Sequence, residues 1–126
     1  MCTPALAARI RPDHAEDINE HTLIYFESNL DAWEQWARGV GLKKFEPAST
    51  LTMDSIFSAL QAAEQGLGIV TAALPLTANW LERSHLVPAF PERVKIPDRY
   101  YALYRKGDEV RPNVQQFLTW LSGEFG

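Results

Sequence analysis

The sequence predicts an α/β fold with a parallel sheet, and two observations carry this prediction. Short apolar runs alternate with segments of helical periodicity along the 126 residues, which is typical of α/β proteins. One run, residues 68–72, is apolar almost throughout and follows a helical segment through a short turn that contains glycine. A run of this kind is typical of a parallel strand that is buried on both faces of its sheet.

The composition predicts a single globular domain in a reducing compartment. Hydrophobic residues make up 46% and charged residues 22% of the chain, which excludes intrinsic disorder. The net charge of −4 gives no general attraction for a nucleic-acid backbone. Cys2 is the single cysteine, so no intramolecular disulfide can form. No apolar run approaches the roughly 20 residues that span a bilayer, and residues 1–9 lack the order of a secretory signal. We therefore expect a cytoplasmic domain.

The first predicted elements are a strand and a helix. Residues 22–26, Thr-Leu-Ile-Tyr-Phe, form a β-branched and aromatic run. The next helix is predicted to begin at Ser28, because Asp31 three residues later completes a variant of the capping box. Its apolar stripe comprises Leu30, Trp33, Trp36 and Ala37. Two glycines, Gly39 and Gly41, are expected to end it.

A second strand, a second helix and a third strand follow in the same pattern. The second strand is predicted over residues 49–53, and either Asp54 or Ser55 caps the helix after it. The buried stripe of this helix is expected to comprise Ile56, Ala59, Leu60 and Ala63. Gly66 is well placed as the residue just beyond the helix end. The chain then continues into the strand at 68–72.

The last third of the chain predicts two strands and two helices. Pro75 suits the first turn of a short helix that runs through about Leu81. Residues 86–90 are predicted as an edge strand, because Pro88 cannot donate to a ladder on both sides. The final strand is expected over 99–104, before a helix opened by Pro112. The four tryptophans, Trp33, Trp36, Trp80 and Trp120, lie in helical stripes and are predicted to be core.

Catalytic and cofactor motifs are absent from the sequence. Gly66-Leu67-Gly68 lies between a helix and a strand, whereas a dinucleotide-binding turn runs from strand to helix. The three histidines are far apart in sequence and disfavour a metal site. A lone cysteine such as Cys2 is more often a small core or strand residue than a nucleophile. The sequence therefore predicts no enzyme, no cofactor and no metal.

A series of short motifs resembles the effector domain of LysR-type transcriptional regulators. The motifs of the first half are Cys-Thr-Pro-Ala-Leu at residues 2–6, D-I-x-x-H-x-L-I at 17–24 and W-x-x-W at 33–36. Those of the second half are A-A-x-x-G-x-G-I at 62–69, Leu-Pro-Leu at 74–76, Leu-Val-Pro-Ala-Phe at 86–90, Tyr-Tyr-Ala-Leu at 100–103 and the helical motif at 112–121. They occur in the family's order and span nearly the whole chain. The W-x-x-W and Tyr-Tyr-Ala-Leu motifs resemble those of the LysR-type subgroup that is related to the glycine-cleavage activator.

The resemblance implies a periplasmic-binding-protein-like (type 2) effector domain, in which a ligand cleft lies between two α/β subdomains. Residues 4–96 would form a complete second subdomain, and residues 1–3 and 97–126 a remnant of the first. The winged helix-turn-helix of the family is not in this chain, so DNA would be reached only through a domain absent from it. The implied function is the sensing of a small-molecule effector, with no membrane involved.

The resemblance also implies an effector site at strand ends and helix N-termini. Its candidate residues are Glu27 and Ser28 after the first strand, Ser55 at the next helix start, Thr71 at the end of the third strand and Tyr101 on the returning strand. Ser28 and Ser55 could also act only as N-caps, and Tyr101 could serve cross-strand packing. A carboxylate at Glu27 favours a ligand with an amine, or it is simply solvated.

Two alternatives stay open, together with one consequence for assembly. The chain could be a stand-alone solute-binding protein of the same fold, because fold does not dictate function. It could also be an inactive, truncated fragment. Without the missing strands of the first subdomain, residues 100–104 would form an unpaired or half-paired edge, which predicts self-association or strand exchange.

Overall fold

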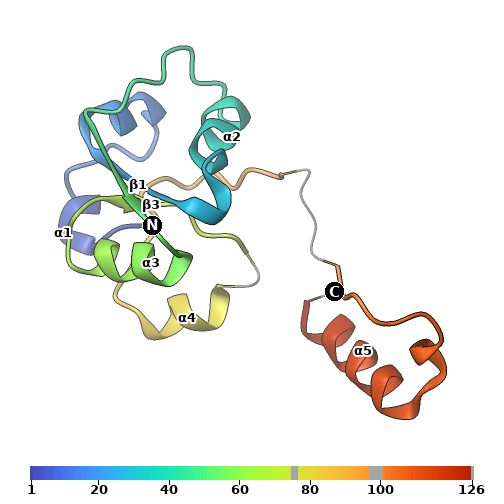
Figure 1. Cartoon of the computed structure of the whole chain (residues 1–126). Coiled ribbons are helices and arrows are strands. Elements are labelled where there is room, and N and C mark those ends of the chain that lie inside the picture. Colours follow the sequence, from blue (N-terminus) through green and yellow to red (C-terminus); the bar gives the residue numbers. More distant parts are fainter. Residues whose placement is uncertain (75–76, 97–100, 126) are drawn as a thin grey trace. The chain divides into compact units, whose positions relative to one another are not determined.

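The computed structural model describes residues 1–74, 77–96 and 101–125, and it divides into two compact units, residues 1–96 and 97–126 (Figure 1). The elements of unit 1 are α1 (Pro4–Ala7), the 3₁₀ helix η1 (Ala15–Glu20), β1 (Thr22–Phe26), the 3₁₀ helix η2 (Glu27–Asn29), α2 (Ala32–Gly39), β2 (Ser49–Met53), α3 (Ile56–Glu64), β3 (Ile69–Val70) and α4 (Ala78–Arg83). Those of unit 2 are the 3₁₀ helix η3 (Asp108–Val110) and α5 (Pro112–Phe125). Each unit is described by itself.

The sheet of unit 1 is parallel, with strand order β2-β1-β3. Its bounds confirm the strands predicted at 22–26 and 49–53, while the third strand is shorter than predicted. The sheet is extended beside β3 by Met1, whose N donates to Val70 O at 2.8 Å and whose O accepts from Val70 N at 2.9 Å. Cys2 then forms an antiparallel bridge with Val87. The N-terminal residues are therefore part of the sheet of unit 1.

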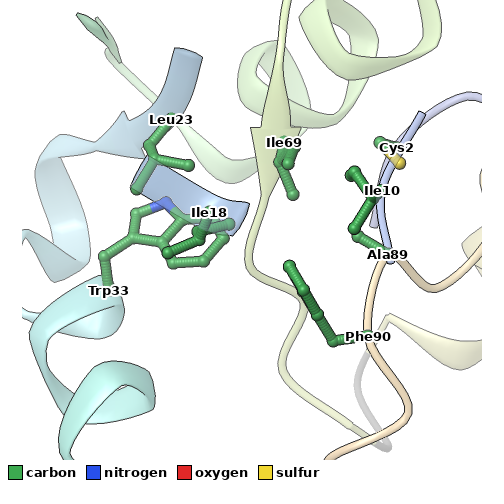
Figure 2. Packing of buried hydrophobic residues seen from close by; sticks show 8 residues of the cluster. All are labelled: Cys2, Ile10, Ile18, Leu23, Trp33, Ile69, Ala89 and Phe90. Atoms are coloured by element: carbon green, nitrogen blue, oxygen red, sulfur yellow. The ribbon is translucent and has the colours of Figure 1, made fainter. Parts of the chain in front are cut away.

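Each face of the sheet carries its own hydrophobic cluster, because successive residues of a strand point to opposite faces. Leu23 of β1 belongs to the cluster beneath α2, which contains Cys2, Ile10, Ile18, Leu23, Trp33, Ile69, Ala89 and Phe90 (Figure 2). Ile24 belongs to the cluster beneath α3, which contains Ile24, Phe26, Ala59, Leu60, Ala62, Ala63, Val70 and Leu86. Trp33 Nε1 also donates to Ile24 O at 3.0 Å, so α2 is tied to the central strand by a buried hydrogen bond.

The helix predicted to begin at Ser28 begins later, and the capping-box prediction is wrong. Residues 27–29 form η2, and Asp31 at the N-cap of α2 makes no side-chain cap hydrogen bond. A tight 3₁₀ turn takes the chain from the sheet edge onto the helix, and side-chain periodicity does not reveal such a turn. The predicted end is confirmed, because α2 ends at Gly39 and Gly41 adopts a left-handed φ of 74°.

The helix predicted after the second strand is α3, and its N-cap, its buried stripe and its end are confirmed. Ser55, rather than Asp54, is the N-cap of α3, and its side chain accepts a hydrogen bond from Ser58 N. Gly66 has a φ of 79° and closes the helix, with Leu67 N donating to Ala62 O at 3.1 Å. This pattern is the Schellman motif, in which glycine favours the left-handed residue.

Two strand predictions in the last third of the chain are wrong or only partly tested. Of the strand predicted at 86–90, only the Val87 bridge forms, because no further strand pairs with it there and Pro88 has no N–H to donate. In the strand predicted at 99–104, residues 101–104 are irregular, while 99 and 100 lie outside the described residues. The described residues of unit 2 contain no strand to pair with them.

The terminal helices also differ in how well they match prediction. Pro75 and Leu76 lie outside the described residues, and α4 begins at Ala78 and ends at Arg83, two residues past the predicted end. α5 begins at Pro112 as predicted. Trp33 is buried as expected, and Trp36 and Trp80 are half-buried. Trp120, however, is 56% exposed, so its assignment to the core is wrong within unit 2.

Candidate functional site

Four of the five candidate residues follow the carboxyl ends of the three parallel strands. Glu27 and Ser28 follow β1, Ser55 comes two residues after β2, and Thr71 comes directly after β3. Because the strands are parallel, their carboxyl ends lie at the same edge of the sheet. The strand order places the loop with Glu27 and Ser28 between the other two. The fold therefore gathers these four residues along one edge.

The segments that follow the strands leave this edge of the sheet in different directions, an arrangement at which α/β proteins bind ligands. The chain leaving β1 passes to α2 on one face, while α3 and α4 pack against the cluster of the other face. The connections after β1 and β3 therefore diverge to opposite faces, although the two strands are neighbours. In open α/β sheets, ligands bind in the crevice outside the strand ends at such a point of divergence.

Ser55 is held in place by its role as a helix cap. Its Oγ accepts from Ser58 N at 3.2 Å and donates to Ser58 Oγ at 3.1 Å. The first N–H groups of an α-helix have no partner within the helix. Ser55 provides the hydrogen-bond acceptor for the N–H group of Ser58. The N–H groups of Ile56 and Phe57, together with the positive end of the helix dipole, are available to a polar or anionic group.

The other candidates differ in exposure and charge. Glu27 and Ser28 are exposed in η2, and Thr71 is half-buried. Tyr101 is 78% exposed and belongs to unit 2, so its participation stays a prediction. The edge thus offers hydroxyl groups and one carboxylate, which can bind and orient a polar ligand.

The described residues offer little for metal binding or nucleophilic catalysis. They contain no group of three or more His, Cys, Asp and Glu side chains placed to hold a metal ion. Cys2 is fully buried, and burial raises the pKa of its thiol, which keeps the thiol protonated. Its predicted role as a core residue is confirmed.

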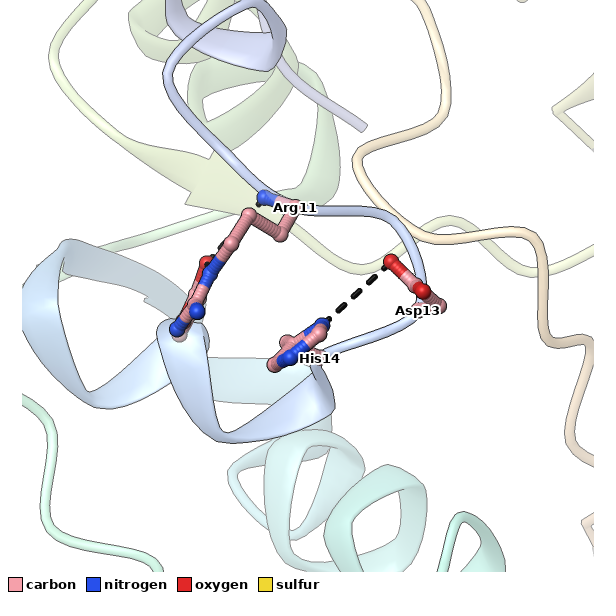
Figure 3. Close-up of polar contacts among 4 residues, drawn as sticks. Arg11, Asp13 and His14 are labelled. Atoms are coloured by element: carbon pink, nitrogen blue, oxygen red, sulfur yellow. Dashed lines mark hydrogen bonds and ion pairs between the residues drawn. The ribbon is translucent and has the colours of Figure 1, made fainter.

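Asp17 has a structural role that its place in the sequence does not reveal. It is a buried carboxylate at 5% exposure, and Arg11 donates to it from Nε at 3.0 Å, from Nη2 at 2.6 Å and from its backbone N at 3.1 Å. These hydrogen bonds from Arg11 lower the pKa of Asp17 to about 2. Figure 3 shows the Arg11 side chain reaching toward η1, and the exposed Asp13–His14 contact on the same loop. An acidic residue six positions after an arginine gave no distinctive signal in sequence.

The family model described as the LysR substrate binding domain matches residues 1–126. The glycine cleavage system transcriptional activator homolog of Haemophilus influenzae is 27% identical over 121 residues, which are 96% of this chain and 40% of that protein. The HTH-type transcriptional activator AmpR of Citrobacter freundii is 24% identical over 124 residues, which are 98% of this chain and 41% of that protein. This chain therefore spans about 40% of the length of these curated relatives.

Solved structures show the same fold. The AmpR effector binding domain from Citrobacter freundii matches with a TM-score of 0.66 at 23% identity, over 97% of this chain and 60% of that chain. The effector domain of AmpR from Pseudomonas aeruginosa matches with a TM-score of 0.55 at 27% identity, over 68% of this chain and 43% of that chain. The periplasmic-binding-protein-like α/β fold is confirmed.

These findings define the chain first as an effector-binding domain by fold. The match over its full length then shows that it belongs to the LysR substrate binding domain family. Among the helices of the described residues, none has the length and apolar character needed to cross a bilayer.

Proposed function

We propose that this chain is the effector-sensing part of a LysR-type transcriptional regulator and that it binds a small-molecule effector without catalysing a reaction. The family match over residues 1–126 and the hydroxyl-bearing edge of the parallel sheet carry the proposal together. Residues 4–96 would form the second subdomain, and residues 1–3 and 97–126 part of the first.

The proposed binding mode uses the residues at the strand ends. The hydroxyls of Ser28 and Thr71 and the N–H groups at the start of α3 would hold a polar group of the effector. Glu27 would favour an amine on the ligand, and Tyr101 is proposed as the source of a phenolic hydrogen bond. To regulate, the effector must bind one arrangement of the protein more tightly than another, since equal affinities shift no equilibrium.

The proposed partners follow from the chain's charge and its exposed residues. A net charge of −4 favours DNA contact only through a domain outside this chain, in a regulator that acts in the cytoplasm. Exposed apolar side chains such as Tyr101 and Leu103 support self-association of this chain. Sedimentation equilibrium should show an oligomer that Leu103→Lys weakens, and a clean monomer at high concentration would contradict self-association.

The effector site is tested by ligand screening followed by mapping. A thermal-shift screen with the amino acids and small dicarboxylic acids as probes is expected to reveal a stabilising ligand. The backbone amide signals of Ser28, Ile56 and Thr71 should then move on titration in NMR spectra. Ser55→Asp preserves a good N-cap but adds a negative charge to the edge. If a charged group of the ligand lies in contact with residue 55, the ligand affinity should change at least tenfold, which corresponds to about 1.4 kcal/mol.

A matched control separates binding from folding. Thr50→Ala removes an exposed side chain from the middle of β2, away from the carboxyl end of the strand, so affinity should be unchanged. A ligand whose binding is insensitive to Ser55→Asp, and whose shifts map away from the three strand ends, would contradict the proposed site.

A further inference from the structure

Residues 88–96 form a strap that leads from the sheet to the boundary between the two units, which lies after residue 96. The strap runs beside α2 (Figure 1). Near its start the Phe90 side chain is buried, and its ring centroid lies 5.2 Å from that of Trp36 on α2. The strap is therefore packed against α2 within unit 1.

A second contact lies one helical turn further along α2. Gly39 is the last residue of α2, and a Cβ added to it would lie 2.2 Å from Val94 Cγ1, 2.7 Å from Cγ2 and 3.0 Å from Cβ. Val94 is half-buried, so its side chain sits directly over the Cα of Gly39. Only glycine leaves room for this contact, two residues before the unit boundary.

Within the part of the chain that the structure describes, apolar packing holds the strap. Among the described residues, no hydrogen bond joins residues 88–96 to the rest of the chain. Release of the strap would therefore break apolar contacts and no hydrogen bond among the described residues. The exposed side chains of Arg93 and Lys95 flank the contact and give a protease access once the strap leaves α2.

We propose that the part of the strap after the buried Phe90, residues 91–96, can be released and that the contact of Val94 with Gly39 is the latch that fixes where the chain leaves unit 1. The consequence for regulation rests on the proposed function: α2 follows the loop of Glu27 and Ser28 and ends at the latch, so an effector that moves α2 would reach the exit of the strap. The latch itself needs no effector.

Limited digestion of the full chain with trypsin tests the latch. Gly39→Ala is expected to raise the initial rate of cleavage after Arg93 and Lys95 about tenfold, because the added methyl group displaces Val94 and cleavage follows the population of the released strap. Mass spectrometry of the first fragments separates cleavage in the strap from cleavage elsewhere. Alanine also favours a helical position over glycine, so far-ultraviolet circular dichroism should show α2 intact.

A double-mutant cycle removes the ambiguity of a single variant. Val94→Ala removes Cγ1 and Cγ2, the two atoms that a methyl at residue 39 would meet most closely. Adding Gly39→Ala to this background should therefore change the cleavage rate by much less than tenfold. Gly123→Ala is the matched control, since the space around Gly123 of α5 is open, and it should leave the rate after Arg93 unchanged.

Two results would overturn the latch. One is a Gly39→Ala variant whose strap is cleaved at the wild-type rate. The other is an equal effect of Gly39→Ala in the presence and absence of the Val94 side chain, since the two residues would then act independently. Neither result bears on the effector site, because the assay contains no ligand.

Discussion

Unit 1 and unit 2 differ in where their apolar side chains lie. Every buried hydrophobic residue of the described chain belongs to unit 1, and all of them except Ala37 of α2 lie in the clusters on the two faces of its sheet. In unit 2, the described residues contain no buried side chain, and Leu103, Phe117 and Trp120 are all exposed. A short helix gains most of its stability from packing, so unit 1 should be stable alone, whereas α5 needs contacts from outside its own unit.

The largest expected effect is a core deletion in unit 1. Leu60→Ala removes a fully buried side chain from beneath α3, and it should lower the free energy of unfolding by about 3 kcal/mol. Leu118→Ala on α5 changes a half-buried residue of unit 2 and should cost under about 1 kcal/mol. Urea unfolding measures both values, and equal losses would contradict the difference between the units.

The next effect comes from the buried carboxylate of unit 1. Asp17→Asn should lower stability at neutral pH by about 2 kcal/mol, because it removes the charged acceptor of the Arg11 side chain. The pKa of Asp17 is lowered from 3.8 to about 2 in the folded protein. The stabilisation is therefore complete above about pH 4 and is lost as the pH falls toward 2. Unfolding curves measured at several pH values from about 2 to about 7 test this, because the range covers both pKa values of Asp17.

A control for this pH dependence lies on the same loop. Asp13 has a side chain that is 85% exposed, so Asp13→Asn should leave both the stability at neutral pH and its acid dependence nearly unchanged. If Asp17→Asn kept the acid dependence of the wild-type protein, the Arg11–Asp17 pair would not be its source.

A glycine substitution should have opposite signs in the two units. A Cβ at Gly68 would lie 2.5 Å from Thr22 O on the neighbouring strand, so Gly68→Ala should destabilise unit 1 by about 2 kcal/mol. Gly123→Ala fills open space on α5 and should favour the helix by about 0.5–1 kcal/mol. Thermal unfolding and circular dichroism measure the two effects, and a destabilising Gly123→Ala would show that α5 is closely packed there.

The smallest expected effect is the loss of a helix cap at the candidate site. Ser55→Ala removes the acceptor of Ser58 N and should cost about 1 kcal/mol. Ser55→Asp should retain most of the stability, since aspartate is also a good N-cap. Equal losses in both variants, measured by urea unfolding, would mean that the cap is not what Ser55 contributes.

Local signals in the sequence located much of unit 1 and part of the candidate site. The run at 22–26, the cap at Ser55 and the glycine at Gly66 were each predicted and confirmed, because the preferences behind them act within a few residues. The η2 turn and the Arg11–Asp17 pair were missed, because a 3₁₀ turn has no apolar period and a side-chain pair depends on how the loop folds back. The strand prediction at 99–104 failed over the described residues 101–104, because the described part of unit 2 contains no strand that could pair with them.

The α/β class, the parallel pairing and both ends of α3 follow from the sequence alone, since apolar periodicity and the chemistry of the Ser55 cap and the Gly66 turn are local. The fate of the apolar runs at 86–90 and 101–104 depends on tertiary structure, because a strand exists when a neighbour completes its hydrogen bonds. Val87 has Cys2 as a partner, whereas no strand in the described part of unit 2 is available to residues 101–104. Tertiary structure also decided that Glu27, Ser28, Ser55 and Thr71 share one edge, because strand order is set by long-range pairing.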